Sequence, residues 1–99
     1  MKAIKELVDK IDDELNGAKE YAEQSLMAKS MGNNTWSQRY KEMALDELKH
    51  SGYIHEKAVE EIQRLQTVYT APVEMQEIWD KEHKKYIEKA AWVKQMLNL

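Results

Sequence analysis

Residues 26–41 read LMAKSMGNNTWSQRYK, and the break at the centre of this stretch decides the fold. Residues 32–35 interrupt two long segments rich in Ala, Leu, Glu, Lys, Gln and Met, which favour helix. Gly32 suits the left-handed residue that follows a helix, and Thr35 with Gln38 matches a capping box that starts the next helix. A connection this short predicts an antiparallel hairpin of two long helices.

Outward from this turn, the composition predicts helices over about residues 2–31 and 36–66. Thr70 and Pro72 suit the start of a third helix over about residues 73–98. The chain has 3 glycines and 1 proline, and no alternating β-branched run competes with helix. The predicted fold class is therefore all-α, a long hairpin plus a third helix that covers one side of its apolar stripe.

Composition narrows the class of protein further. A chain of 99 residues is expected to form one domain, spanning residues 1–99, and the absence of cysteine excludes thiolate metal sites and disulfides. A net charge of −3 without long blocks of one sign argues against a nucleic-acid partner. No apolar run is long enough to span a membrane, and the N-terminal stretch is amphipathic and acidic, so we expect a cytoplasmic protein without membrane contact.

Several polar residues fall among the apolar positions of the predicted helices. At about 100° per residue, Glu47 lies near the centre of the second helix's stripe, His50 lies on its flank, and Glu14 lies at the edge of the first helix's stripe. Glu82 falls inside the stripe of the third helix, with His83 beside it. Buried carboxylates normally pair, neutralise or bind a cation, so converging acids favour a metal site. Glu47 and His50 have the E-x-x-H spacing that puts both side chains on one helix face.

The sequence also holds more apolar surface than three helices are expected to bury. Its large aromatic residues and 6 methionines predict a homodimer or higher homo-oligomer; among the aromatic residues are Trp36, Tyr40, Tyr53, Trp79, Tyr86 and Trp92. His55, at the edge of the second stripe, is expected on the helix surface, with a ligand role as the alternative. Gly17, near Glu14, indicates a close approach between helices, a local bulge or a tolerated defect.

The order Glu14, Tyr21, then Glu47-x-x-His50 resembles one half of a ferritin-like di-iron carboxylate protein. In bacterioferritins and rubrerythrins a Glu, a Tyr two turns later and a Glu-x-x-His on the next helix have this order, and residues 40–59 (YKEMALDELKHSGYIHEKAV) are similar to their second helix. The family's chains supply a second such set from two further helices, whereas this chain has one further helix and no second matching motif on the correct face. Encapsulated ferritins, in which two short chains share one site, suggest a four-helix bundle completed by dimerisation.

The resemblance implies a di-iron site, with Mn or Zn as alternatives, in which Glu47 bridges the irons and Glu14 and His50 are terminal ligands. Tyr21 would be a nearby hydrogen-bond donor or redox-active phenol. A competing arrangement keeps the site in one chain and adds Glu82 and His83 from the third helix.

The implied activity is oxidation of Fe(II) or reduction of peroxide, as a ferroxidase or peroxidase-type oxidoreductase. The alternative is a metal-free helical interaction or assembly module, in which Glu14 and Glu47 pair with lysines or lie in a wet interface. An encapsulating or assembly partner would fit either function.

Overall fold

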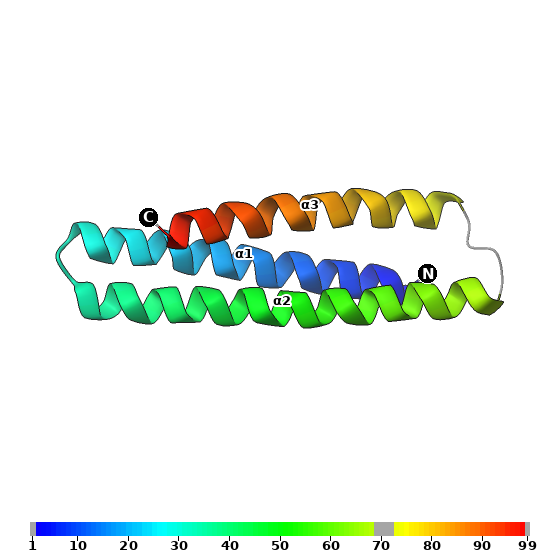
Figure 1. Ribbon diagram of the computed structural model, residues 1–99, viewed down its shortest axis with the longest axis horizontal. Coiled ribbons are helices and arrows are strands. Elements are labelled where there is room, and N and C mark those ends of the chain that lie inside the picture. The colour runs from blue at the N-terminus through cyan, green and yellow to red at the C-terminus, as the bar shows by residue number, and fades with distance from the viewer. Residues whose placement is uncertain (1, 69–72, 99) are drawn as a thin grey trace.

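The computed structural model describes residues 2–68 and 73–98 as three helices: α1 (Lys2–Ser30), α2 (Asn34–Val68) and α3 (Val73–Leu97). The hairpin of α1 and α2 is antiparallel, and α3 lies along it in the same direction as α1 (Figure 1). The molecule is elongated, with principal extents of 56 × 18 × 17 Å. The predicted all-α hairpin with a third helix is confirmed, and the helix ends lie within two residues of the predicted ones.

The turn between α1 and α2 serves both helices at once. Gly32 has a φ of 78°, and its N–H donates to the Lys29 carbonyl at 3.0 Å while the Asn33 N–H donates to the Ala28 carbonyl at 2.8 Å. This is the Schellman pattern that closes a helix C-terminus. The Asn33 side chain then accepts from the Trp36 N–H at 3.2 Å. Asn33 is thus the N-cap of α2.

The predicted capping box at Thr35 is therefore wrong. One asparagine that both closes α1 and caps α2 leaves no need for further loop residues, so α2 begins at Asn34, two residues earlier than predicted. The predicted start signals of the third helix, Thr70 and Pro72, lie outside the described residues.

The core runs along the hairpin on a regular alternation of four and three residues. In α1 the fully or nearly fully buried apolar positions repeat at this spacing, as do several in α2; they are Ile4, Val8, Ile11, Leu15, Ala18 and Ala22 in α1 and Ala44, Leu48, Ala58 and Ile62 in α2. Alanines with no exposed surface, among them Ala18 and Ala44, let the two backbones approach closely. Burial of each larger aliphatic side chain contributes about 1.5–3 kcal/mol.

The third helix covers only one flank of the hairpin. It packs chiefly against α1 and makes only sparse backbone contact with α2. Its contacts on α1 include Asp12, which pairs with Lys85 at 3.2 Å, and Asn16, which accepts from Lys89 at 3.3 Å. Asp12 and Glu14 point about 200° apart around the α1 axis. We call the side that carries Asp12 and Asn16 the covered flank, and the side that carries Glu14 the open flank.

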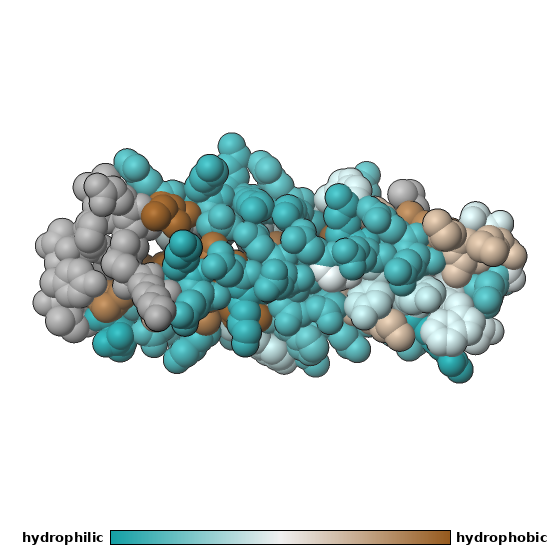
Figure 2. Space-filling view, turned by 180° about the vertical axis from the view of Figure 1, so that it is seen from behind, coloured by the Kyte–Doolittle hydropathy of each residue, from teal (hydrophilic) through white to brown (hydrophobic). Residues whose placement is uncertain are grey.

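This asymmetry explains why large apolar residues of α2 remain exposed. Trp36 and Met43, which fall on the apolar stripe of α2 on a helical wheel, are 42% and 37% exposed because none of the three described helices covers the open flank. In α3, Ile78 is 51% exposed. Seen from behind, hydrophilic side chains cover the middle of the molecule, and weakly polar to apolar atoms gather toward the hairpin end (Figure 2). Over the described residues, no helix has a stretch apolar enough to cross a bilayer.

Candidate metal site

Glu14 of α1 meets Glu47 and His50 of α2 on the open flank. One ligand atom from each of the three side chains lies within 4.8 Å of the other two. The His50 Nδ1 lies 3.8 Å from a Glu14 carboxylate oxygen, and the His50 and Glu14 side chains are 55% and 27% exposed. The predicted convergence of these residues is therefore observed. His50, predicted on the flank of the stripe, is the most exposed of the three.

Gly17 makes room for the carboxylate of Glu47. It lies one turn after Glu14 in α1, and a Cβ built on it would stand 3.3 Å from the Glu47 Oε2. Any larger residue would push against the carboxylate. Of the possibilities left open by the sequence, close approach fits this glycine, since the Glu47 side chain would be in tight contact with a Cβ at this position.

The carboxyl groups of Glu14 and Glu47 repel each other when both are charged. A hydrogen bond with Glu14, partial burial and the negative charge of Glu14 raise the pKa of Glu47 from 4.5 to about 7, and His50 only partly offsets this. Near neutral pH the pair thus shares a proton, one carboxyl donating to the other. Among the described residues, no lysine or arginine is paired with either carboxylate. A cation would take over the role of that proton.

An aromatic row extends from this group toward the hairpin end. The Tyr21 ring stacks on Tyr40 with a centroid distance of 6.3 Å, and Tyr40 contacts Trp36 at 5.6 Å. Tyr21 lies one turn beyond Gly17, on the same side of α1 as Glu14. Tyr21 therefore lies two turns beyond Glu14 on the same face of α1, and its ring contact is with Tyr40.

Glu82 and His83 lie elsewhere. Glu82 faces α1 near Asp12, where burial and the Asp12 charge raise its pKa and the nearby Lys85 and Lys89 lower it. His83 contacts His55, with ring centroids 4.9 Å apart. Neither residue is part of the three-residue group on the open flank. The arrangement in which the third helix completes the site within one chain therefore has no geometric support.

His55 departs from its predicted position on the helix surface. Its Nε2 is buried without a hydrogen-bond partner among the described residues, and its ring lies among Trp79, His83 and Tyr86. The signal for this was present in the sequence. His55 lies four residues after Ser51 and three before Ala58, both of which have no exposed surface, so it continues the alternation of the core.

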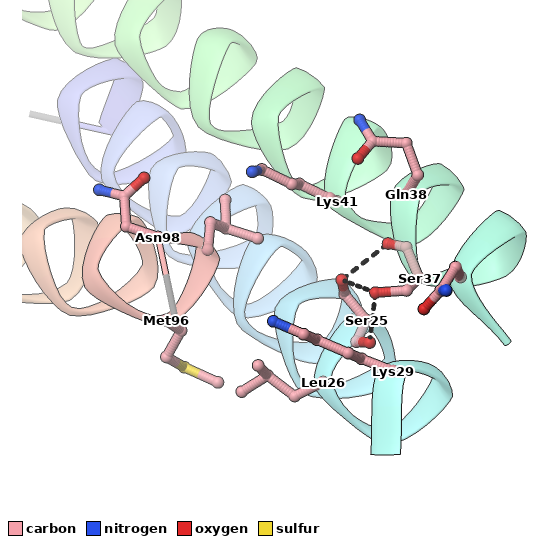
Figure 3. Close-up of a pocket in the computed structure, with 10 residues that line it drawn as sticks. Ser25, Leu26, Lys29, Ser37, Gln38, Lys41, Met96 and Asn98 are labelled. Carbon is pink, nitrogen blue, oxygen red and sulfur yellow. Dashed lines mark hydrogen bonds between the residues drawn. The ribbon is translucent and has the colours of Figure 1, made fainter. Parts of the chain in front are cut away.

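A separate polar pocket of about 330 Å³ lies near the C-terminal end of α3. There the Ser25 hydroxyl donates to the Ser37 carbonyl at 2.7 Å, and the Ser37 hydroxyl donates to the Ser25 carbonyl at 2.9 Å, which ties α1 to α2 (Figure 3). Lys29 and Lys41 border the same pocket, and none of the described residues that line it has a carboxylate or imidazole side chain (Figure 3). This pocket is therefore unrelated to the Glu14, Glu47 and His50 group.

The comparisons with known proteins assign no family. No protein-family model, no curated protein and no solved structure matches this chain. What is established is an all-helical protein of three helices with a candidate metal-binding group formed by Glu14, Glu47 and His50.

Proposed function

We propose that this chain is a metal-binding protein whose Glu14, Glu47 and His50 hold iron in a di-metal carboxylate centre shared between two copies. The observation that carries the proposal is the approach of these three ligand atoms to within 4.8 Å of one another. Carboxylate and imidazole are ligands for iron, manganese and zinc, so the donor set fits the proposed metal. The raised pKa of Glu47, caused chiefly by Glu14, indicates a pair that a divalent cation would stabilise.

Sharing between two copies follows from the number of ligands. One chain offers two carboxylates and one imidazole, whereas a di-iron bundle uses four carboxylates and two imidazoles. Two open flanks facing each other would supply the full set. Exposed Trp36 and Met43 on the same flank give such a contact apolar surface to bury.

Bound iron would supply redox chemistry toward oxygen or peroxide, and the activity we propose is oxidation of Fe(II) or reduction of peroxide. The chain's own residues have distinct tasks. Glu47, held against Gly17, would exchange its shared proton for metal, and Glu14 and His50 would complete the ligands of each copy. Tyr21, two turns beyond Glu14 on the same face of α1 and in ring contact with Tyr40, would act as a neighbouring phenol.

The test compares two carboxylate variants after anaerobic loading with Fe(II) and desalting. Glu47→Gln removes a ligand of the proposed site, and Glu82→Gln removes another partly buried carboxylate whose pKa is also raised. We expect about one iron per chain in the wild type and in Glu82→Gln, as a dimer by native mass spectrometry, and at least about a tenfold loss in Glu47→Gln. Iron retained by Glu47→Gln would overturn the assignment.

A second candidate function is a metal-free interaction module. The observation in its favour is a mostly apolar groove of about 460 Å³ at the hairpin end, lined by Met27, Met31, Trp36 and Tyr40 among others. In that case neither the wild type nor the variants would hold iron above background.

If iron is bound, a further measurement tests the proposed activity. The rate of air oxidation of Fe(II) by the wild type, compared with that of Glu47→Gln, separates iron that turns over from iron that is only bound.

A further inference from the structure

The contact between α2 and α3 is built around one histidine. His55 stacks on Tyr86 with ring centroids 4.5 Å apart and an interplanar angle of 20°, and it meets Trp79 at 5.3 Å. The His83 ring stands edge-on to it at 4.9 Å. Since backbone contact between α2 and α3 is sparse, these rings are a principal connection between the two helices.

The protonation state of His55 matters because its surroundings suit only a neutral ring. Its Nε2 is buried with no hydrogen-bond partner, and an imidazolium needs acceptors for both N–H groups. Burial and the proximity of His83 lower the pKa of His55, and Glu56 raises it by a smaller amount. Among the described residues, no charged group of α1 contributes to the shift of the His55 pKa.

A protonated His55 therefore has two routes to a lower free energy. It can lose its proton again, or it can turn toward water, which breaks the ring contacts with Tyr86 and Trp79. Trp79 is only 7% exposed and belongs to the core, so its contact with His55 joins the core to this bridge.

We propose that His55, Trp79, His83 and Tyr86 form an acid-sensitive latch, which holds α3 against α2 while His55 is neutral and releases it when His55 takes up a proton. The latch lies on the α3 side of the hairpin, apart from Glu14, Glu47 and His50, and it does not depend on metal. Acidification would loosen the contact between α2 and α3 first, because α3 is bound to α1 by separate contacts such as Lys85 to Asp12.

The first test uses the wild-type chain with metal removed by a chelator. Nuclear magnetic resonance of the histidine Cε1–H groups follows each ring from pH 8 to 5. We expect His55 to titrate below the reference value of about 6.5, together with a change in the Tyr86 ring signals. A midpoint at or above about 6.5 would mean that attraction between a charged His55 and the aromatic faces wins, and would overturn the latch.

A second test reports on Trp79 alone. In a Trp36→Phe, Trp92→Phe background, emission from Trp79 should shift toward the red on acidification with the His55 midpoint. His55→Phe keeps an aromatic ring without a titrating group and should abolish the shift, whereas His50→Gln should leave it in place. A shift that survives in His55→Phe would overturn the proposal, and the wild-type titration decides if that variant does not fold.

Discussion

Each flank of the hairpin brings two carboxyl groups together, but among the described residues a lysine is paired with such a group only on the covered flank. On the covered flank, Asp12 approaches Glu82, and Lys85 and Lys89 lie beside them. On the open flank, Glu14 approaches Glu47, and His50 only partly offsets the effect of Glu14 and Asp46 on the Glu47 pKa. Similar acid pairs therefore meet different chemistry: lysines of the chain partly offset the first pair, and the second retains a proton that a metal can replace. The difference indicates where a ligand is needed, which neither pair alone would.

The largest expected contrast concerns one tryptophan on each side. Trp79, 7% exposed, anchors α3 to the core, and Trp79→Ala should lower the free energy of unfolding by about 3–5 kcal/mol. Trp36 is 42% exposed on the open flank, and Trp36→Ala should lower the free energy of unfolding of the dilute, metal-free chain by less than about 1 kcal/mol. Urea denaturation followed by circular dichroism measures both. Equal losses would mean that the open flank is already packed in the single chain.

The next contrast is the pH dependence of the metal-free protein. A carboxyl pKa raised by folding favours the protonated native state, so the Glu47 contribution is fully present below pH 4.5 and is lost as the pH rises through about 7. Screening by nearby water reduces the effect of this shift to about 1–2 kcal/mol. Glu47→Gln should remove this decline, and subtracting its urea stability profile from that of the wild type isolates it from the opposite trend of His55. Parallel profiles would contradict the shared proton.

The same carboxyl pair predicts how metal binding responds to pH. Because metal displaces the proton shared by Glu14 and Glu47, affinity should rise by up to about tenfold per pH unit below about pH 7 and level off above it. Titration with Fe(II) under anaerobic conditions, or with Zn²⁺ as a redox-inert probe, measures this slope. Affinity independent of pH between 5 and 7 would place the metal on other ligands.

Replacing one glycine on each flank should give a smaller difference between the flanks. Alanine at an interior helix glycine stabilises a helix by up to about 1 kcal/mol, and Gly52→Ala should approach this gain, whereas Gly17→Ala should gain less because the Glu47 carboxylate must shift. At Gly52 the added Cβ lies 3.7 Å from the Tyr86 hydroxyl, an ordinary contact, whereas at Gly17 it lies 3.3 Å from the Glu47 Oε2. Only Gly17→Ala should therefore weaken metal binding, by about tenfold. Thermal unfolding and iron content together test the pair.

The fold was predictable because its determinants are local. Residues 32–35 and the regular spacing of apolar positions specify a hairpin, and only the capping residue was misassigned, since Asn33 acts in both helices. The group of Glu14, Glu47 and His50 was also predictable, since helix geometry sets the E-x-x-H face and the short turn sets which α1 residue lies opposite.

What the sequence left open was the position of α3 around the hairpin. A helical wheel gives the inward direction of each helix but not which flank a third helix will cover. For that reason Trp36 and Met43 are exposed although they fall on the apolar stripe of α2, and Glu82, which was considered beside Glu47, faces Asp12. The ion pair that reveals the choice, Asp12 with Lys85, joins residues distant in sequence.

That ion pair gives the smallest expected effect on stability. The sign of the coupling energy between the paired residues should differ between the two flanks. A double-mutant cycle with Asp12→Asn and Lys85→Gln should give a favourable coupling of about 0.2–1 kcal/mol, since the Lys85 and Asp12 side chains are 41% and 22% exposed. A cycle with Glu14→Gln and Glu47→Gln in metal-free protein above pH 7 should give coupling of the opposite sign, because like charges meet there. Adding metal should reverse that second sign, since bound metal makes both carboxylates favourable. A favourable coupling without metal would mean that Glu14 and Glu47 are already balanced within the chain, and the open flank would then need no cation.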